Sequence, residues 1–345
     1  MTMKLSSPFG WLALAALSAS SLQGQENMLP VSRTTGVVTV DLPINKSTLV
    51  GAPFTSIVAS GTVSAVNGNV LTLSSSPSSL PDLTTTPYAI KITSRVDQRG
   101  TGSNAPSGSS TNAYGYAAKI SAQASQDVTA ALAVAPNVGD EFVIYPVKTL
   151  ASIFGAANSA GLKADASPVN ADIVYLGSEG ELVGYFYNSS ASAWRAVATP
   201  DSGDAGATEL APGTAVLVAR KAGGSAANLV ISGEQLPGRQ VSNVSVGFQV
   251  INNPFSVSTT LAASGLESSV TGGTGPGNAD ILYLEQDGVL TGYYYKNGGV
   301  GGTGWRALAD PLSNQGAALV APGKSILFKE QVGAAGLVIQ EPFAE

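Results

Sequence analysis

The chain has 345 residues, of which only 12% are charged, and its formal net charge is -6 at pH 7. The acidic balance and the lack of clustered Lys and Arg argue against nucleic acid or an anionic membrane surface as a partner. The chain contains no histidine and no cysteine. This excludes Ser-His-Asp and Cys-His catalysis, His-based zinc sites and disulfide bonds.

Residues 1–25, MTMKLSSPFGWLALAALSASSLQGQ, have the arrangement of a secretory signal peptide. Lys4 precedes an apolar run from Trp11 to Leu17, and small residues follow. The run is too short to span a bilayer, and no later stretch is long and apolar enough to do so. We therefore expect export, cleavage between Ser20 and Gln25, and a secreted or cell-surface location, with the periplasm as the alternative.

Residues 26–148 are expected to form an N-terminal β domain. Short alternating runs are typical of strands, and they begin at Gly36, Gly61, Tyr88, Ala117 and Asp140. The Asn67-Gly68 pair predicts a tight hairpin. Five or more short strands in this length favour a small barrel or sandwich, which the loops at 77–87 and 101–112 interrupt.

The remainder divides into two homologous modules, residues 149–240 and 241–345. ADIVYLGSEGELVGYFY from Ala171 and ADILYLEQDGVLTGYYY from Ala279 are identical at ten of seventeen positions. The match resumes as WRAVATP and WRALADP, and then as APGTAVLV and APGKSILF, at offsets between 108 and 111 residues. A nearly constant offset over this length indicates a duplicated module.

Each module is expected to be an antiparallel meander of about five strands. Glu179-Gly180 and Asp287-Gly288 are suited to hairpin turns that need positive φ, and both Ala-Pro-Gly triplets favour type II turns. Only residues 149–158 are typical of a short helical turn. The predicted fold is all-β: an N-terminal small β-barrel or sandwich followed by two homologous antiparallel β modules that pack side by side.

Three features together carry a family resemblance: the GTVSAVNGNVLTLSS segment, the GDEFVIYPVKTLASIFG junction and the repeated Y-x-L, G-Y-x-Y, W-R and A-P-G pattern. With them the chain resembles a family of exported proteins that is abundant in Verrucomicrobia and related bacteria. The resemblance covers nearly all of the chain after the leader. It implies export and a bacterial origin, and it supplies neither a reaction nor catalytic residues.

Carboxylates are the acid–base groups left for catalysis, and Asp172 and Asp280 recur in both modules. A glycoside hydrolase would need two such acids about 5 to 9.5 Å apart in one cleft. The structural alternative is that each aspartate caps a turn or pairs with Arg195 or Arg306, which recur in step. We favour this alternative and expect no enzymatic activity.

Metal and cofactor sites are not expected. The acidic turns that begin at Ser178, Asp201 and Glu285 lack the regular acid spacing of a calcium loop. The GGTGPG stretch from Gly272 lies between expected strands, whereas a dinucleotide fingerprint lies between a strand and a helix.

The aromatic residues of the two modules are the candidate ligand-binding set, together with the adjacent arginines. These residues are Tyr185, Tyr187, Trp194, Arg195, Tyr293, Tyr295, Trp305 and Arg306. If exposed, they would form a platform for stacking sugar rings. If buried, they form cross-strand pairs that fill the core. We expect burial, because aromatic residues beside Leu and Gly are ordinary core material.

These observations favour an exported, non-enzymatic protein with a structural or adhesive role at the cell surface. Strand edges rich in Thr and Val would permit self-association, and an extracellular polysaccharide is the other expected partner. A carbohydrate-binding module that uses the Tyr and Trp side chains is the alternative function.

Overall fold

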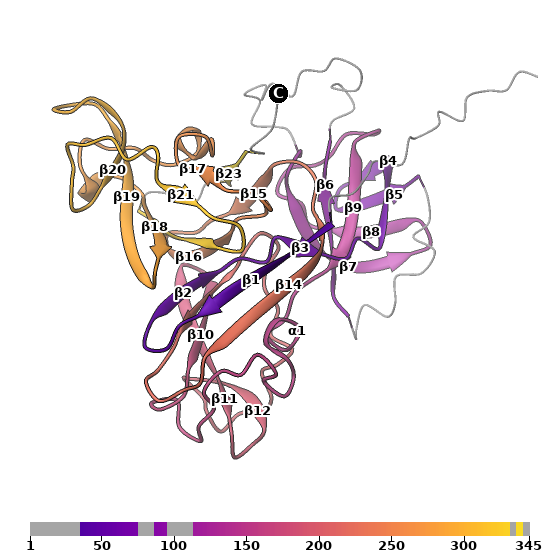
Figure 1. Ribbon diagram of the computed structural model, residues 1–345. Coiled ribbons are helices and arrows are strands. Elements are labelled where there is room, and N and C mark those ends of the chain that lie inside the picture. The colour runs from indigo at the N-terminus through magenta and orange to yellow at the C-terminus, as the bar shows by residue number, and fades with distance from the viewer. Residues whose placement is uncertain (1–34, 75–85, 95–112, 332–335, 341–345) are drawn as a thin grey trace, which may run out of the picture. The chain divides into compact units, whose positions relative to one another are not determined.

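The computed structural model of the chain describes residues 35–74, 86–94, 113–331 and 336–340. The predicted signal peptide at 1–25 lies outside these ranges, as does most of the two predicted loops. The described residues form a nearly all-β protein with several antiparallel sheets, which confirms the predicted fold class (Figure 1). None of the helices in these ranges is long and apolar enough to cross a membrane.

Six strands close into a barrel, in the order β4-β5-β8-β7-β6-β9. Their bounds are β4 Ala59–Asn67, β5 Val70–Leu73, β6 Tyr88–Ile92, β7 Ala117–Ala124, β8 Asp127–Ala130 and β9 Glu141–Pro146. Alternate side chains point inward to a core that includes Val63, Leu71, Ile90 and Ile144. The predicted hairpin joins β4 to β5, and Gly68 adopts a φ of 59° in its turn. The small barrel is therefore confirmed.

Three strands that precede the barrel do not take part in it. They are β1 Thr35–Leu42, β2 Ser47–Val50 and β3 Phe54–Thr55. β1 pairs along its whole length with β14, β2 pairs with β13, and β3 pairs with the end of β14. The run that begins at Gly36 was predicted as part of the N-terminal β domain, and the structure differs because its pairing partners lie in the first repeat.

The first repeat combines these strands with a later part of the chain. The later elements are α1 Leu150–Phe154, β10 Ile173–Ser178, β11 Glu181–Asn188, β12 Ala193–Ala196, β13 Val216–Ala219 and β14 Ala227–Gln235. Its main sheet has the order β12-β11-β10-β13-β2. β10 to β12 form the predicted meander, whereas β13 returns to pair with β10, and β14 leaves to pair with β1. The predicted helical turn is present as α1, whose capping residue is Thr149.

The second repeat has the same plan. Its elements are β15 Gln240–Asn243, β16 Gly247–Asn252, β17 Thr259–Thr260, η2 Leu266–Ser268, η3 Pro276–Asn278, β18 Ile281–Gln286, β19 Val289–Asn297, β20 Thr303–Ala307, β21 Leu319–Val320, β22 Ser325–Glu330 and β23 Gly336–Ile339. The main sheet has the order β16-β22-β18-β19-β20, β15 pairs with β23, and β17 pairs with β21. In this comparison β15 and β16 take the places of β1 and β2.

The duplication therefore extends further upstream than the sequence analysis predicts. Val50 pairs with Val216 in the first repeat, and Ile251 pairs with Ile326 at the matching place in the second. Pro-Phe follows each strand, at 53–54 and at 254–255. The barrel is thus an insertion between β3 and α1 of the first repeat.

The two repeats contact each other through equivalent groups. The Gly51 N–H donates to the Gly323 carbonyl at 2.8 Å, and the Asn252 N–H donates to the Gly213 carbonyl at 3.0 Å. The donors are equivalent positions of the two repeats, and so are the acceptors. An apolar cluster lies at this contact and draws on both copies: Leu49, Ala215, Leu217, Val250 and Leu327. This reciprocity is consistent with the predicted side-by-side packing.

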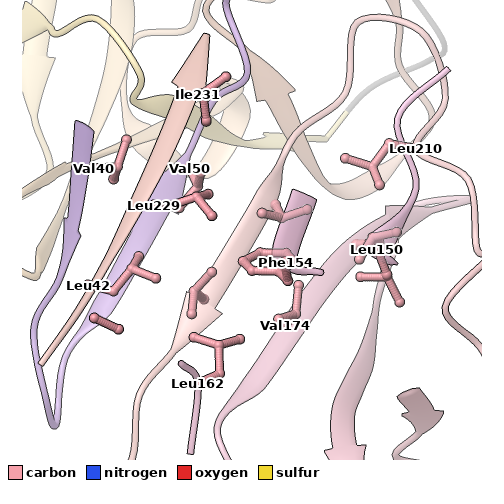
Figure 2. Packing of buried hydrophobic residues seen from close by; sticks show 14 of the residues in the cluster. Val40, Leu42, Val50, Leu150, Phe154, Leu162, Val174, Leu210, Leu229 and Ile231 are labelled. Atoms are coloured by element: carbon pink, nitrogen blue, oxygen red, sulfur yellow. The ribbon is translucent and has the colours of Figure 1, made fainter. Parts of the chain in front are cut away.

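The core of the first repeat lies between the β1–β14 pair and the main sheet. Figure 2 shows side chains of β1, β14, α1 and β10 packed together, including Leu42, Leu229, Phe154 and Val174. These four side chains are almost fully buried. Burial of side chains of this kind contributes about 1.5–3 kcal/mol each, so β1 is an integral part of this repeat.

The predicted turns form as their residues require. Glu179, Gly180, Asp287 and Gly288 all have φ between 50° and 87°, as a type I′ hairpin needs. In the first Ala-Pro-Gly triplet the Thr214 N–H donates to the Ala211 carbonyl at 3.0 Å. The Lys324 N–H makes the equivalent bond to Ala321 at 3.2 Å in the second. Gly213 and Gly323 have positive φ, which confirms the type II turns.

Candidate functional site

The aromatic residues of the first repeat meet across two neighbouring strands. Trp194 on β12 stands opposite Tyr187 on β11, and their ring centroids are 5.6 Å apart at an interplanar angle of 77°. Phe154 also contacts the indole, at 5.7 Å between ring centroids and an interplanar angle of 49°. The indole N–H donates to the Gly155 carbonyl at 3.0 Å. Trp194 is only 1% exposed, so its ring is part of the core.

The second repeat contains the same arrangement. Trp305 on β20 stands opposite Tyr295 on β19, with ring centroids 5.3 Å apart and an interplanar angle of 72°. Trp305 is 2% exposed, and its indole nitrogen has no hydrogen-bond partner among the described residues. Edge-to-face pairs of this kind contribute about 0.5–1.5 kcal/mol beyond the area they bury.

The predicted burial of these aromatic residues is confirmed for both tryptophans. The four tyrosines of the candidate set, Tyr185, Tyr187, Tyr293 and Tyr295, are half-buried and pack against the same cores. A sugar ring stacks on an aromatic face that is open to solvent. The tryptophan faces are covered by their own sheets, so they offer no such platform.

Neither candidate arginine pairs with a recurring aspartate, and Arg306 is held by the backbone. Arg306 is 2% exposed and donates to the carbonyls of Trp305, Gly301 and Gly302. Arg195 is half-buried, and its Nε atom has no hydrogen-bond partner among the described residues. The predicted pairing of these arginines with Asp172 and Asp280 is wrong.

Asp172 instead forms a buried ion pair with a residue that the sequence analysis did not single out. Its Oδ2 atom accepts from Arg220 Nε at 2.5 Å, and both side chains are 0% exposed. The backbone N–H groups of Lys163 and Lys221 each donate to the carboxylate at 2.6 Å. Arg220 also donates to the Leu42 carbonyl of β1 at 2.7 Å. The pair therefore ties β10, β13 and β1 together.

Asp280 has the equivalent backbone bonds without the arginine. Thr271 N–H donates to Oδ2 at 2.6 Å, and Gln331 N–H donates to Oδ1 at 3.0 Å. The position of Arg220 is taken by Glu330 in the second repeat. Each recurring aspartate thus accepts hydrogen bonds from the chain around it, which is the structural role that we favoured from the sequence.

The acidic turns considered for calcium do not gather ligands. Within the described ranges no group of three or more Asp, Glu, His or Cys side chains lies close enough to hold a metal ion. Glu285 accepts from the Gly288 N–H at 2.6 Å and pairs with Lys324. This carboxylate therefore supports the hairpin turn of the second repeat.

The open side of β1 is a second candidate site, which the sequence analysis did not locate. β1 is an edge strand of the sheet β1-β14-β3, and in the described part of the chain no strand pairs with its other side. The strand is eight residues long, TGVVTVDL, with Asp41 as its one charged residue. Val37 on β1 and Val230 on β14 are each 64% exposed on the outer face. The alternating pattern from Gly36 predicted a strand at this place. The pattern does not specify which other strand pairs with it.

Comparison with known proteins identifies no relative. No protein-family model matches the chain, and neither a curated protein nor a solved structure is detectably similar to it. The function is therefore inferred from the residues and their geometry.

Proposed function

We propose that the protein is an exported, non-catalytic structural protein of the cell surface that assembles with copies of itself through the open edge of β1. One observation carries the proposal: β1 is a long edge strand of β-forming residues, and no strand of the described residues pairs with its outer side. Soluble proteins usually block such edges with Lys, Pro, a bulge or a covering segment. β1 contains neither Lys nor Pro, and it pairs with β14 without a register shift.

The charges of β1 are compatible with pairing between two copies. In an antiparallel pair that sets Val38 opposite Thr39 of the second copy, each Asp41 faces Gly36 of the other chain. The two Asp41 side chains then lie about 16 Å apart along the strands. This exceeds the screening length of about 8 Å at physiological salt, so like-charge repulsion is weak. The contact is isologous and closes as a dimer with twofold symmetry.

The experiment compares wild type with Val37→Lys by sedimentation velocity over a range of concentrations. Val37 is exposed, so the substitution leaves the core intact, while a lysine at the edge disfavours strand addition. We expect the dissociation constant of the dimer to rise by at least about tenfold, equivalent to roughly 1.4 kcal/mol.

Two controls make this experiment specific. Val169→Lys adds the same charge at a turn residue that is 76% exposed, and it should leave self-association unchanged. Val230→Lys alters the same outer face on the neighbouring strand and should have the smaller effect. Wild type that stays monomeric at every concentration would refute the proposal, and so would equal losses for the substitutions at 37 and 230.

The carbohydrate-binding alternative has weaker support. Its proposed platform depends on Trp194 and Trp305, and both rings are covered by their own repeats.

A further inference from the structure

A small cavity of about 60 Å³ lies where the barrel meets the first repeat. The end of the barrel contributes Tyr145 on β9 and Lys148 just after it. The repeats contribute Thr55 of β3, Pro212 of the type II turn and Gln240 of β15. The cavity thus draws its walls from segments that are far apart in the sequence.

Three side chains that line this cavity carry donor groups for which the described part of the chain offers no acceptor. The Thr55 hydroxyl is buried and has no hydrogen-bond partner among the described residues. Neither the Tyr145 hydroxyl nor the Lys148 ammonium group makes a hydrogen bond or ion pair within the described ranges. A buried polar group without a partner costs about 1–3 kcal/mol, so the Thr55 hydroxyl indicates a missing acceptor, and the Tyr145 hydroxyl and the Lys148 ammonium group line the same cavity.

Burial acts on both titratable groups in the direction expected for groups without partners. It raises the pKa of the Tyr145 hydroxyl and lowers the pKa of the Lys148 ammonium group. Lys91, which also lines the cavity, is already engaged: its ammonium group donates to the carbonyls of Pro237 at 2.9 Å and Gly238 at 3.3 Å. Lys148 is therefore the cation available to a ligand.

The rest of the lining defines the chemistry that fits. None of the described residues that line the cavity is an aspartate or a glutamate, although the protein as a whole is acidic. Val147, Leu210 and Leu236 supply apolar walls. One ammonium group and two hydroxyl donors match the single charge and two oxygens of a carboxylate. A phosphate group carries more charge and more acceptor oxygens than these donors satisfy.

We propose that this cavity is a binding site for a small carboxylate, with Lys148 as its counter-ion and the hydroxyls of Tyr145 and Thr55 as its hydrogen-bond donors. The volume is well below the roughly 150 Å³ of a cavity that accepts benzene. The ligand is therefore either a free short-chain acid or the carboxylate end of a larger molecule, such as a uronate of an acidic polysaccharide. Because the walls come from both the barrel and the repeats, the bound acid stabilises their contact.

The test is isothermal titration calorimetry of the intact protein with propionate, with its neutral analogue propionamide, and with a glucuronate oligosaccharide. Propionate should bind and propionamide should not, because the amide lacks the charge that pairs with Lys148. Tighter binding of the oligosaccharide would assign the ligand to acidic polysaccharide, and tighter binding of propionate would assign it to free acids. Absence of binding by both carboxylates would overturn the proposal, because the cavity would then hold water alone.

Variants locate the binding within the cavity. Lys148→Met keeps the aliphatic stem and should abolish binding, while Tyr145→Phe keeps the ring and should weaken it by about tenfold. Lys221→Met removes an exposed lysine outside the cavity and should bind like wild type. If Lys148→Met is folded by circular dichroism and still binds, the site is elsewhere. Val37→Lys should bind like wild type, so this test is independent of the proposed self-association.

Discussion

Asp172 and Asp280 show how one recurring residue stabilises two homologous modules to different degrees. Both carboxylates accept backbone hydrogen bonds at 2.6–3.0 Å, but only Asp172 faces an arginine. The guanidinium group of Arg220 is fully buried, so removing its partner leaves an uncompensated charge in the core. The first repeat therefore depends on its aspartate more than the second does.

Asp172→Asn is expected to lower the free energy of unfolding by about 3–5 kcal/mol, the usual cost of breaking a buried ion pair from one side. Asp280→Asn should cost about 1–3 kcal/mol, because one backbone N–H loses its acceptor and no charge is stranded. Urea unfolding followed by circular dichroism measures both. Equal losses, or a larger loss for Asp280→Asn, would show that the Arg220 pair is not what distinguishes the repeats.

At the scale of elements, the hairpin turn between β10 and β11 joins one repeat to the other. A Cβ atom on Gly180 would lie 1.9 Å from the Val246 carbonyl oxygen, and the Phe248 N–H donates to the Gly180 carbonyl at 2.6 Å. Gly180 therefore meets two demands at once: a φ of 87° and a close approach of the backbone that leads into β16.

Gly180→Ala and Gly68→Ala form a matched pair that separates these demands. Gly68 has a φ of 59° in a turn with open space around it, so alanine there should cost about 1–2 kcal/mol from backbone conformation alone. Gly180→Ala adds a clash with main-chain atoms, and we expect a further 1–3 kcal/mol, roughly as for overpacking. Chemical denaturation of both variants provides the comparison. Similar losses of stability for the two variants would mean that the backbone at Gly180 can move away from the backbone at Val246 without a cost in free energy.

The elements that could be predicted from the sequence are those specified by residues close together in the chain. The Asp287-Gly288 turn, the Ala-Pro-Gly turns and the short helix at 149–158 each depend on a few adjacent residues, and all are present. The burial of the tryptophans also followed from their neighbours on the strand. The ion-pair partner of Asp172 could not be predicted in this way. The matching spacing in both modules suggested Arg195, but the ion pair with Arg220 depends on which strand lies next to β10 in the sheet.

The other features that could not be predicted from the sequence depend on contacts between segments that are far apart in the chain. β1 pairs with β14 across almost 200 residues, from Thr35 to Glu234, and an alternating pattern does not specify its partner. Before the barrel, the trace of the duplication in the sequence is as short as the match of Pro53-Phe54 with Pro254-Phe255. The cavity lined by Thr55, Tyr145 and Lys148 was likewise beyond prediction, because these residues come from β3, from β9 and from the position two residues beyond β9.

At the scale of the whole molecule, the second repeat shows that the plan shared by both repeats does not require the barrel. Between Ser256 and Ala262 the second repeat uses five residues, Val257–Leu261, where the first repeat uses residues 56–157. The positions that follow the gap correspond, since Gly161 and Gly265 have φ values of 72° and 73°, and Leu162 and Leu266 are both buried. The barrel therefore extends a connection that the fold can make in a few residues.

Replacing residues 56–157 by the sequence of Val257–Leu261 should give a shortened protein in which the two repeats still fold together. The contact between repeats through Leu49 and Val250, and the exchanged backbone bonds at Gly51 and Asn252, lie outside the deleted segment. Stability should fall, because the replacement also removes α1 of the first repeat, so Trp194 loses its contact with Phe154 and its hydrogen bond to the Gly155 carbonyl. The measurement is a thermal melt followed by near-ultraviolet circular dichroism, which reports the packing of Trp194 and Trp305. A single cooperative transition would show that the barrel and α1 are together dispensable, whereas a broad, non-cooperative melt would show that the first repeat needs this segment to complete its core.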